Sequence, residues 1–110
     1  MINAGNLFAA LRPQPNEQFT TLAAHPGAFV ERIVSTGQTN PSGFWYDQAW
    51  PEWVVVLQGA ADLMIEGESG PRRLGPGDWI ELPAHVRHRV EGTEASPPTV
   101  WLAVHWKAPG

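Results

Sequence analysis

Residues 52–59 have the sequence EWVVVLQG, in which four aliphatic side chains follow one another with no polar residue between them. A second run of this kind, TVWLAVHW, occupies residues 99–106. A half-exposed strand alternates apolar and polar residues, so these two runs predict strands that are covered on both faces. There are two alternatives for what covers the second face of the sheet. One is a second copy of the same sheet, which predicts a homodimer, and the other is an N-terminal segment folded over it.

Outward from these runs, the chain consists of short apolar or alternating segments separated by turn residues. Gly and Pro each occur eleven times in 110 residues, which excludes long helices and leaves one short helix over Asn6–Arg12, ended by Pro13. Without crossover helices a parallel sheet is excluded. The sequence predicts an all-β fold, a small antiparallel β-barrel or jelly roll, as one domain over residues 1–110 with an N-terminal arm over 1–16. The strands are expected at 17–23, 29–36, 44–48, 52–58, 60–66, 71–74, 78–82, 88–93 and 99–107.

Composition excludes several classes of function. Seven Lys and Arg against eleven Asp and Glu give a net charge of −4, which argues against nucleic acid as a partner. No Cys is present, so a disulfide framework and a Cys nucleophile are excluded. No apolar run is long enough to cross a membrane, and residues 1–8 do not have the pattern of a secretory signal. We therefore expect a cytoplasmic protein.

Two spacings carry the strongest functional signal. Six residues separate Glu52 from Gly59, and Gly77 is followed by Pro83 after five residues and by His88 after four more. Together with the β-rich pattern, these spacings resemble the two motifs of the cupin superfamily, here at about 43–59 and 77–88. The first family motif is His-x-His, three or four residues, Glu, six residues, Gly. The second is Gly, five residues, Pro-x-Gly, two residues, His.

The chain departs from the family pattern at three motif positions. The two His positions of the first motif fall on Tyr46 and Gln48 with a three-residue gap before Glu52, or on Trp45 and Asp47 with a four-residue gap. His85 stands where the family has Gly. His85 is expected to be a fourth metal ligand, a hydrogen-bond donor to one of the ligands, or a side chain tolerated in a turn with positive φ.

A site can be argued from the residues themselves. Tyr46 and Gln48 are two apart on an expected strand, so their side chains project to one face. If 49–51 is a tight turn, Glu52 opens the next antiparallel strand beside Gln48. In a closed barrel these groups would meet the imidazole of His88 in the interior. Such a mixed set of nitrogen and oxygen ligands suits a divalent metal: Zn, Mn, Fe or Ni. The expected metal ligands are Gln48, Glu52, His85 and His88, with Asp47 the alternative to Gln48 in the other register.

Two further residues are candidates for the same interior. Tyr46 is expected to orient a substrate or to act as general acid, or else to be a core tyrosine bonded to the backbone. His105 is expected to be structural or to line a pocket.

The function that the resemblance and the site imply is a small cupin that binds a divalent metal and a small polar organic ligand, with catalysis left open. The alternative is a binding or sensory module without metal, or a dimeric scaffold.

Overall fold

The computed structural model describes residues 1–108, and this part of the chain folds into eight β-strands without a helix. The strands are β1 (Gln18–His25), β2 (Ala28–Ser35), β3 (Glu52–Gln58), β4 (Ala61–Ile65), β5 (Arg72–Leu74), β6 (Trp79–Leu82), β7 (His88–Thr93) and β8 (Thr99–Trp106). These bounds confirm eight of the nine expected strands to within about two residues. The turns between them fall at the Gly- and Pro-rich breaks.

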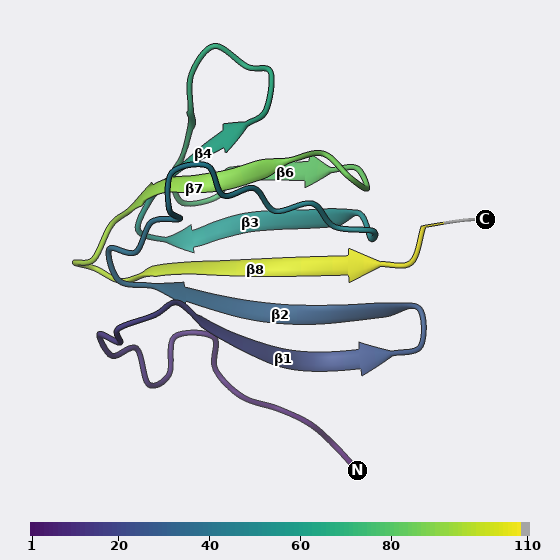
Figure 1. The fold of residues 1–110 in the computed structure, drawn as a ribbon. Coiled ribbons are helices and arrows are strands. Elements are labelled where there is room, and N and C mark those ends of the chain that lie inside the picture. Colours follow the sequence, from purple (N-terminus) through teal and green to yellow (C-terminus); the bar gives the residue numbers. More distant parts are fainter. Residues whose placement is uncertain (109–110) are drawn as a thin grey trace.

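The strands form two antiparallel sheets, as Figure 1 shows. One has five strands in the order β1-β2-β8-β3-β6, and the other has three in the order β5-β4-β7. The hydrophobic core lies between them, because its buried side chains come from both sheets: Ile33, Val54, Val56, Leu82, Trp101 and Ala103 from the first, and Ala61, Leu63, Leu74 and Val90 from the second. The all-β class is therefore confirmed.

The segment expected as a strand at 44–48 is instead an extended connection that lies along the edge of β7. It makes one isolated bridge, between Tyr46 and His88. Further up the same edge, Asn40 exchanges two hydrogen bonds with Val90, one through its backbone N–H and one through its side-chain oxygen. The connection therefore completes the wall of the smaller sheet without forming a regular strand, and Gln48 does not pair with β3.

The helix expected at Asn6–Arg12 is wrong. Residues 7–10 form a single turn, in which the Asn6 side chain accepts a hydrogen bond from the backbone N–H of Phe8. Ala10 has a positive φ of 55°, which ends the turn. Arg32 of β2 binds the carbonyl oxygens of Leu7 and Ala9, so these carbonyls serve a tertiary contact and not a helix.

The N-terminal arm lies along β1 at the edge of the larger sheet (Figure 1), and Asn3 Nδ2 donates to the carbonyl oxygen of Leu22. At the other edge of this sheet, the outward-facing Trp79 of β6 remains 62% exposed and packs at 6.0 Å between ring centroids on Trp53 of β3. The arm therefore leaves this end of the outer face uncovered.

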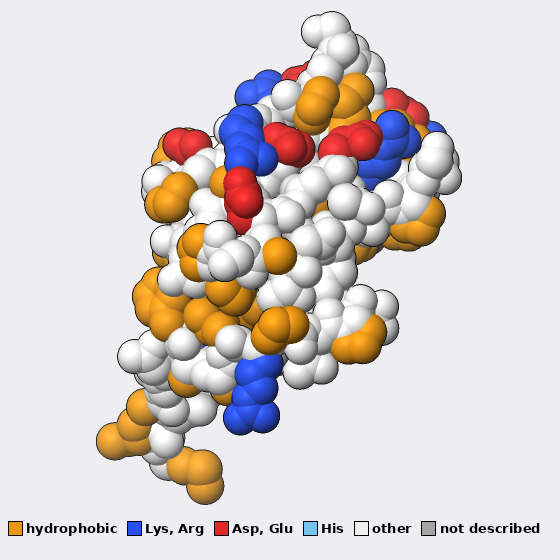
Figure 2. All heavy atoms as spheres, turned by 90° about the vertical axis from the view of Figure 1, so that its left-hand side faces the viewer, with side chains coloured by type: hydrophobic (Ala, Val, Ile, Leu, Met, Phe, Trp, Pro, Cys, Tyr) orange, Lys and Arg blue, Asp and Glu red, His pale blue; other side chains and the backbone are white. Residues whose placement is uncertain are grey.

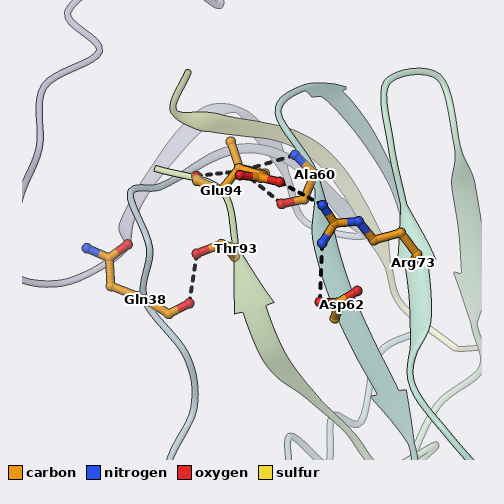
Figure 3. A network of polar contacts seen from close by, with 7 residues as sticks. Gln38, Ala60, Asp62, Arg73, Thr93 and Glu94 are labelled. Carbon is orange, nitrogen blue, oxygen red and sulfur yellow. Dashed lines mark hydrogen bonds and ion pairs between the residues drawn. The ribbon is translucent and has the colours of Figure 1, made fainter. Parts of the chain in front are cut away.

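Polar contacts tie the end of the smaller sheet to its neighbours. Arg73 of β5 bridges Asp62 of β4 and Glu94 (Figure 3), and the hydroxyl of Thr93 donates to the carbonyl oxygen of Gln38. In Figure 2 the charged side chains gather toward the end of the molecule that carries the β4–β5 hairpin, and hydrophobic side chains are more prominent below them. Across residues 1–108, no helix has the length and apolar character needed to cross a membrane.

Candidate functional site

A cavity opens between the two sheets and is lined by both of them and by the 38–48 connection. Its volume is about 70 Å³, counted as the space that the centre of a water molecule can reach, which is room for several water molecules or a small organic group. Its polar lining residues come from distant parts of the chain: Glu17, Glu31, Tyr46, Gln48, Glu52, His88 and His105. The rest of the wall is apolar or aromatic.

Glu52 lies at the centre of the polar part of the cavity. It is the first residue of β3 and is paired on one side with Leu82 of β6 and on the other with His105 of β8. Its side chain is buried, and its two carboxylate oxygens lie 3.7 Å from His88 Nε2 and 3.7 Å from His105 Nε2. Burial raises the pKa of the Glu52 carboxyl, the charges of His105 and His88 oppose that rise, and the charge of Glu31 adds to it.

His88 begins β7 directly after the loop that Pro83 starts, and its side chain is buried. The ring Nδ1 lies 2.9 Å from the carbonyl oxygen of Val86. A carbonyl oxygen only accepts, so Nδ1 carries the proton and donates it. In the neutral ring, Nε2 therefore presents its lone pair to the carboxylate of Glu52. The placement of His88 and Glu52 in one cavity agrees with the expectation from the sequence.

His105 and Glu31 belong to the same group, although the sequence alone does not single out Glu31 and predicts only a structural or pocket-lining role for His105. The two side chains point into the cavity from neighbouring strands, and His105 Nε2 lies 3.4 Å from Glu31 Oε1. Nε2 is buried and has no hydrogen-bond partner in the part of the chain that the structure describes. The His105 ring also stacks on Phe29 at 4.3 Å between centroids. The alternation of β8 puts His105 on the same face as Trp101, but only the register of β8 against β3 places it beside Glu52.

Tyr46 and Gln48 both line the cavity, as their two-residue spacing predicts, whereas Asp47 does not. The Tyr46 ring stacks on His88 at 5.4 Å between centroids and meets the edge of Phe44 at 4.8 Å. Burial raises the pKa of the Tyr46 phenol, and the nearby carboxylates add to the rise. The phenol therefore stays protonated and can donate a hydrogen bond.

His85 does not join the other expected ligands. Its φ is 65°, so it occupies the family's glycine position with a left-handed backbone, and its side chain is 68% exposed. The ring Nδ1 lies 2.7 Å from Asp47 Oδ1, and the backbone N–H of His85 donates to the carbonyl oxygen of Gln48. His85 and Asp47 thus hold the connection to the second-motif loop on the outside of the cavity.

A third carboxylate reaches the cavity from the segment before β1. Glu17 accepts a hydrogen bond from the hydroxyl of the buried Ser35, which in turn accepts one from the indole N–H of Trp101 at 3.0 Å. Burial raises the pKa of Glu17, and the Ser35 hydrogen bond opposes the rise. No local sequence signal points to Glu17, because its position depends on the pairing of β1 with β2.

The donor chemistry of the cavity suits a divalent metal, since two imidazoles, a carboxylate and an amide oxygen face it. The orphaned Nε2 of His105 and the free lone pair of His88 Nε2 are the atoms that would bind one. As the side chains stand, however, no group of three His, Asp or Glu residues within 1–108 is arranged to hold a metal ion.

The fold and motifs place the chain in a family. The family model described as "Cupin domain" matches residues 33–105, and the chain belongs to the cupin family. A crystal structure of a protein from Ralstonia eutropha JMP134, provisionally named mannose-6-phosphate isomerase, is 50% identical with a TM-score of 0.92, covering 96% of this chain and 98% of that one. A cupin superfamily protein from Desulfitobacterium hafniense DCB-2 has the same fold, with 15% identity and a TM-score of 0.73, covering 88% of this chain and 83% of that one.

A curated relative has a different name. The pyrimidine/purine nucleoside phosphorylase of Trichlorobacter lovleyi is 32% identical over 65 residues, which are 58% of this chain. The match spans 62% of the length of that relative.

Proposed function

We propose that the cavity binds a small polar organic molecule, which Glu52, His88, His105 and Tyr46 hold by hydrogen bonds. The observation that carries this proposal is the arrangement around Glu52: a buried carboxylate faces two imidazole nitrogens, each 3.7 Å away. That separation is too long for a hydrogen bond. A buried polar group without a partner costs roughly 1–3 kcal/mol, so a ligand that supplies donors and acceptors here would recover this free energy.

The same groups are suited to moving a proton on the bound molecule. Glu52 and the two imidazoles can accept or donate one, and the Tyr46 phenol can donate a hydrogen bond to a ligand oxygen. The sugar isomerase name of the Ralstonia relative is compatible with such chemistry, which is why binding assays should be followed by a search for isomerisation.

A divalent metal in this cavity is the second candidate, and a specific observation favours it. The Val86 carbonyl fixes the proton of His88 on Nδ1, so two electron-pair donors, His88 Nε2 and the Glu52 carboxylate, face each other. A cation between them would remove that repulsion. Glu52, His88 and His105 would hold the metal, with Gln48 beside them, and the bound metal would supply Lewis-acid chemistry to the ligand.

Both candidates can be tested on one preparation purified without chelator. Small molecules released by denaturation are identified by mass spectrometry, and metals are measured by elemental analysis, in the wild type and in Glu52→Gln, His88→Ala and His105→Ala. His25→Ala, an exposed position on β1, is the matched control. We expect an organic ligand that is retained in His25→Ala and lost in Glu52→Gln.

The outcomes separate the candidates. Stoichiometric metal that disappears in both His88→Ala and Glu52→Gln supports the metal site. An organic ligand that remains bound in Glu52→Gln and His88→Ala contradicts the proposal, because these residues would then play no part in binding.

A further inference from the structure

The cavity has an unbalanced charge. Three of its 14 lining residues are carboxylates, namely Glu17, Glu31 and Glu52, and none of the 14 is Lys or Arg. The two imidazoles of His88 and His105 are the other groups there that can carry charge near neutral pH. Even with both of them protonated, three ionised carboxylates leave the lining negative.

The cations of the chain lie elsewhere, and most are paired there. The four arginines on the smaller sheet and directly before β7 are each in an ion pair with an acidic partner: Arg72, Arg73, Arg87 and Arg89. Figure 3 shows one of these pairs, with Arg73 between Asp62 and Glu94. Arg32 is committed to the carbonyl oxygens of the N-terminal arm.

This distribution of charge discriminates between ligand classes. Proteins hold a phosphate or carboxylate ligand with Arg, Lys or a set of backbone N–H groups, and an anion brought into this cavity would meet three carboxylates at short range. A cationic group would be attracted by the same carboxylates. It would also lie among the aromatic rings of Phe19, Tyr46 and Trp101, which line the cavity and whose faces attract cations.

Glu31 is the carboxylate best placed to receive such a group. Within residues 1–108 its only close polar contact is with His105, at 3.4 Å, and its side chain is 17% exposed. Glu52, by contrast, lies deeper, and Glu17 is engaged by Ser35. Of the two carboxylates that face His105, Glu31 is therefore the more accessible to a ligand.

We infer that the ligand is a small organic cation, a molecule with an ammonium group and neighbouring hydroxyls; this inference rests on the proposed function. The cavity correspondingly excludes phosphate esters and other anions. This assignment differs from what the names of the Ralstonia and Trichlorobacter relatives would imply, since a mannose-6-phosphate isomerase and a phosphorylase both handle phosphate.

The test compares probes of matched shape and different charge, using chelator-treated wild-type protein and calorimetry at pH 7.5. One series is mannosamine, mannose and mannose 6-phosphate. A smaller series, chosen to fit the enclosed part of the cavity, is ethanolamine, ethylene glycol and glycolate. We expect the amine to bind at least roughly tenfold more tightly than the neutral probe, the increment typical of one charge-assisted hydrogen bond, and the anion not to bind.

A pair of variants tests the role of Glu31. Glu31→Gln keeps the shape of the side chain and removes its charge, so the preference for amine over neutral probe should fall by roughly tenfold while the affinity for the neutral probe is kept. Glu81→Gln, an exposed carboxamide substitution on β6 of the same sheet, should leave the preference unchanged.

Two results would overturn the inference. Binding of mannose 6-phosphate or glycolate as tight as that of the matching amine removes the charge assignment and leaves the proposed function intact. Failure of all six probes to bind, with no organic molecule released from the purified protein, contradicts both the charge assignment and the proposed function.

Discussion

The carboxylate of Glu52 and the imidazole of His105 lie opposite each other on β3 and β8, with Oε2 3.7 Å from Nε2. Because the His105 charge is the largest influence that lowers the pKa of Glu52, and the His88 charge the next, His105→Leu should raise this pKa further, and His88→Leu should raise it by less. Carbon NMR titration of protein labelled at the glutamate carboxyl carbons measures both shifts. An unchanged or lower pKa in His105→Leu would show that the two groups do not interact.

Glu17 gives the stability of the fold a dependence on pH. Its pKa is raised in the folded protein by burial, so the folded state binds this proton more tightly than the unfolded chain does. The stabilisation is fully present below the ordinary value of 4.5 and is lost as the pH rises through the raised pKa. At pH 7 the buried charge therefore costs the fold stability.

Glu17→Gln removes that cost and keeps an oxygen that can accept the Ser35 hydroxyl. We expect the variant to have a larger free energy of unfolding than the wild type at pH 7, and the difference to shrink as the pH falls through the raised pKa toward 4.5. Urea denaturation across this range measures it, with Glu81→Gln as the exposed control. A variant less stable than the wild type at pH 7 would contradict the burial argument.

Gly59 closes the first motif under two constraints. Its φ is 77°, and a Cβ built on it would lie 2.5 Å from Thr99 Oγ1 and 2.8 Å from Thr99 Cα. Gly59→Ala combines backbone strain with a clash against backbone, and we expect it to cost about 2–4 kcal/mol in urea denaturation. Gly67→Ala, where φ is 93° and no atom lies within 4 Å of the added Cβ, should cost about 1 kcal/mol, from backbone strain alone. Equal costs would show that the contact with Thr99 is easily relieved.

The homodimer expected from the doubly apolar strands stays a prediction. The uncovered end of the outer face carries Trp53 and Trp79, with Glu81 of β6 opposite Trp53, so the two indoles offer apolar area that a second copy of this face would bury. Light scattering after size exclusion should give twice the mass of the chain, and Trp79→Arg should give a monomer. A monomeric wild type at micromolar concentration removes the prediction.

The strands could be predicted from the sequence because each is a short apolar or alternating run that ends at Gly or Pro, and these signals are local. The placement of Glu52 and His88 followed from the motif spacings. Glu17, Glu31 and the neighbourhood of His105 depend instead on how β1, β2, β8 and β3 are aligned. A pattern along one strand does not show which residue of a distant strand lies opposite.

The same distinction explains the two local errors. The connection at 44–48 has the composition of a strand, yet it has a partner on one side only and makes a single bridge to β7. The N-terminal segment has helix-forming residues, but Arg32 binds two of its carbonyls and a tertiary contact overrides a weak local preference.

The cavity wall formed by the 38–48 connection is attached mainly through its backbone: Asn40 and Tyr46 donate to carbonyl oxygens of β7, and the Gln48 carbonyl oxygen accepts from the loop before β7. Such bonds do not depend on which side chains the connection carries inward. The side chains of Tyr46 and Gln48 can therefore be changed while the backbone attachment is kept. Libraries randomised at these two positions should yield altered ligand preference with little loss of folded protein.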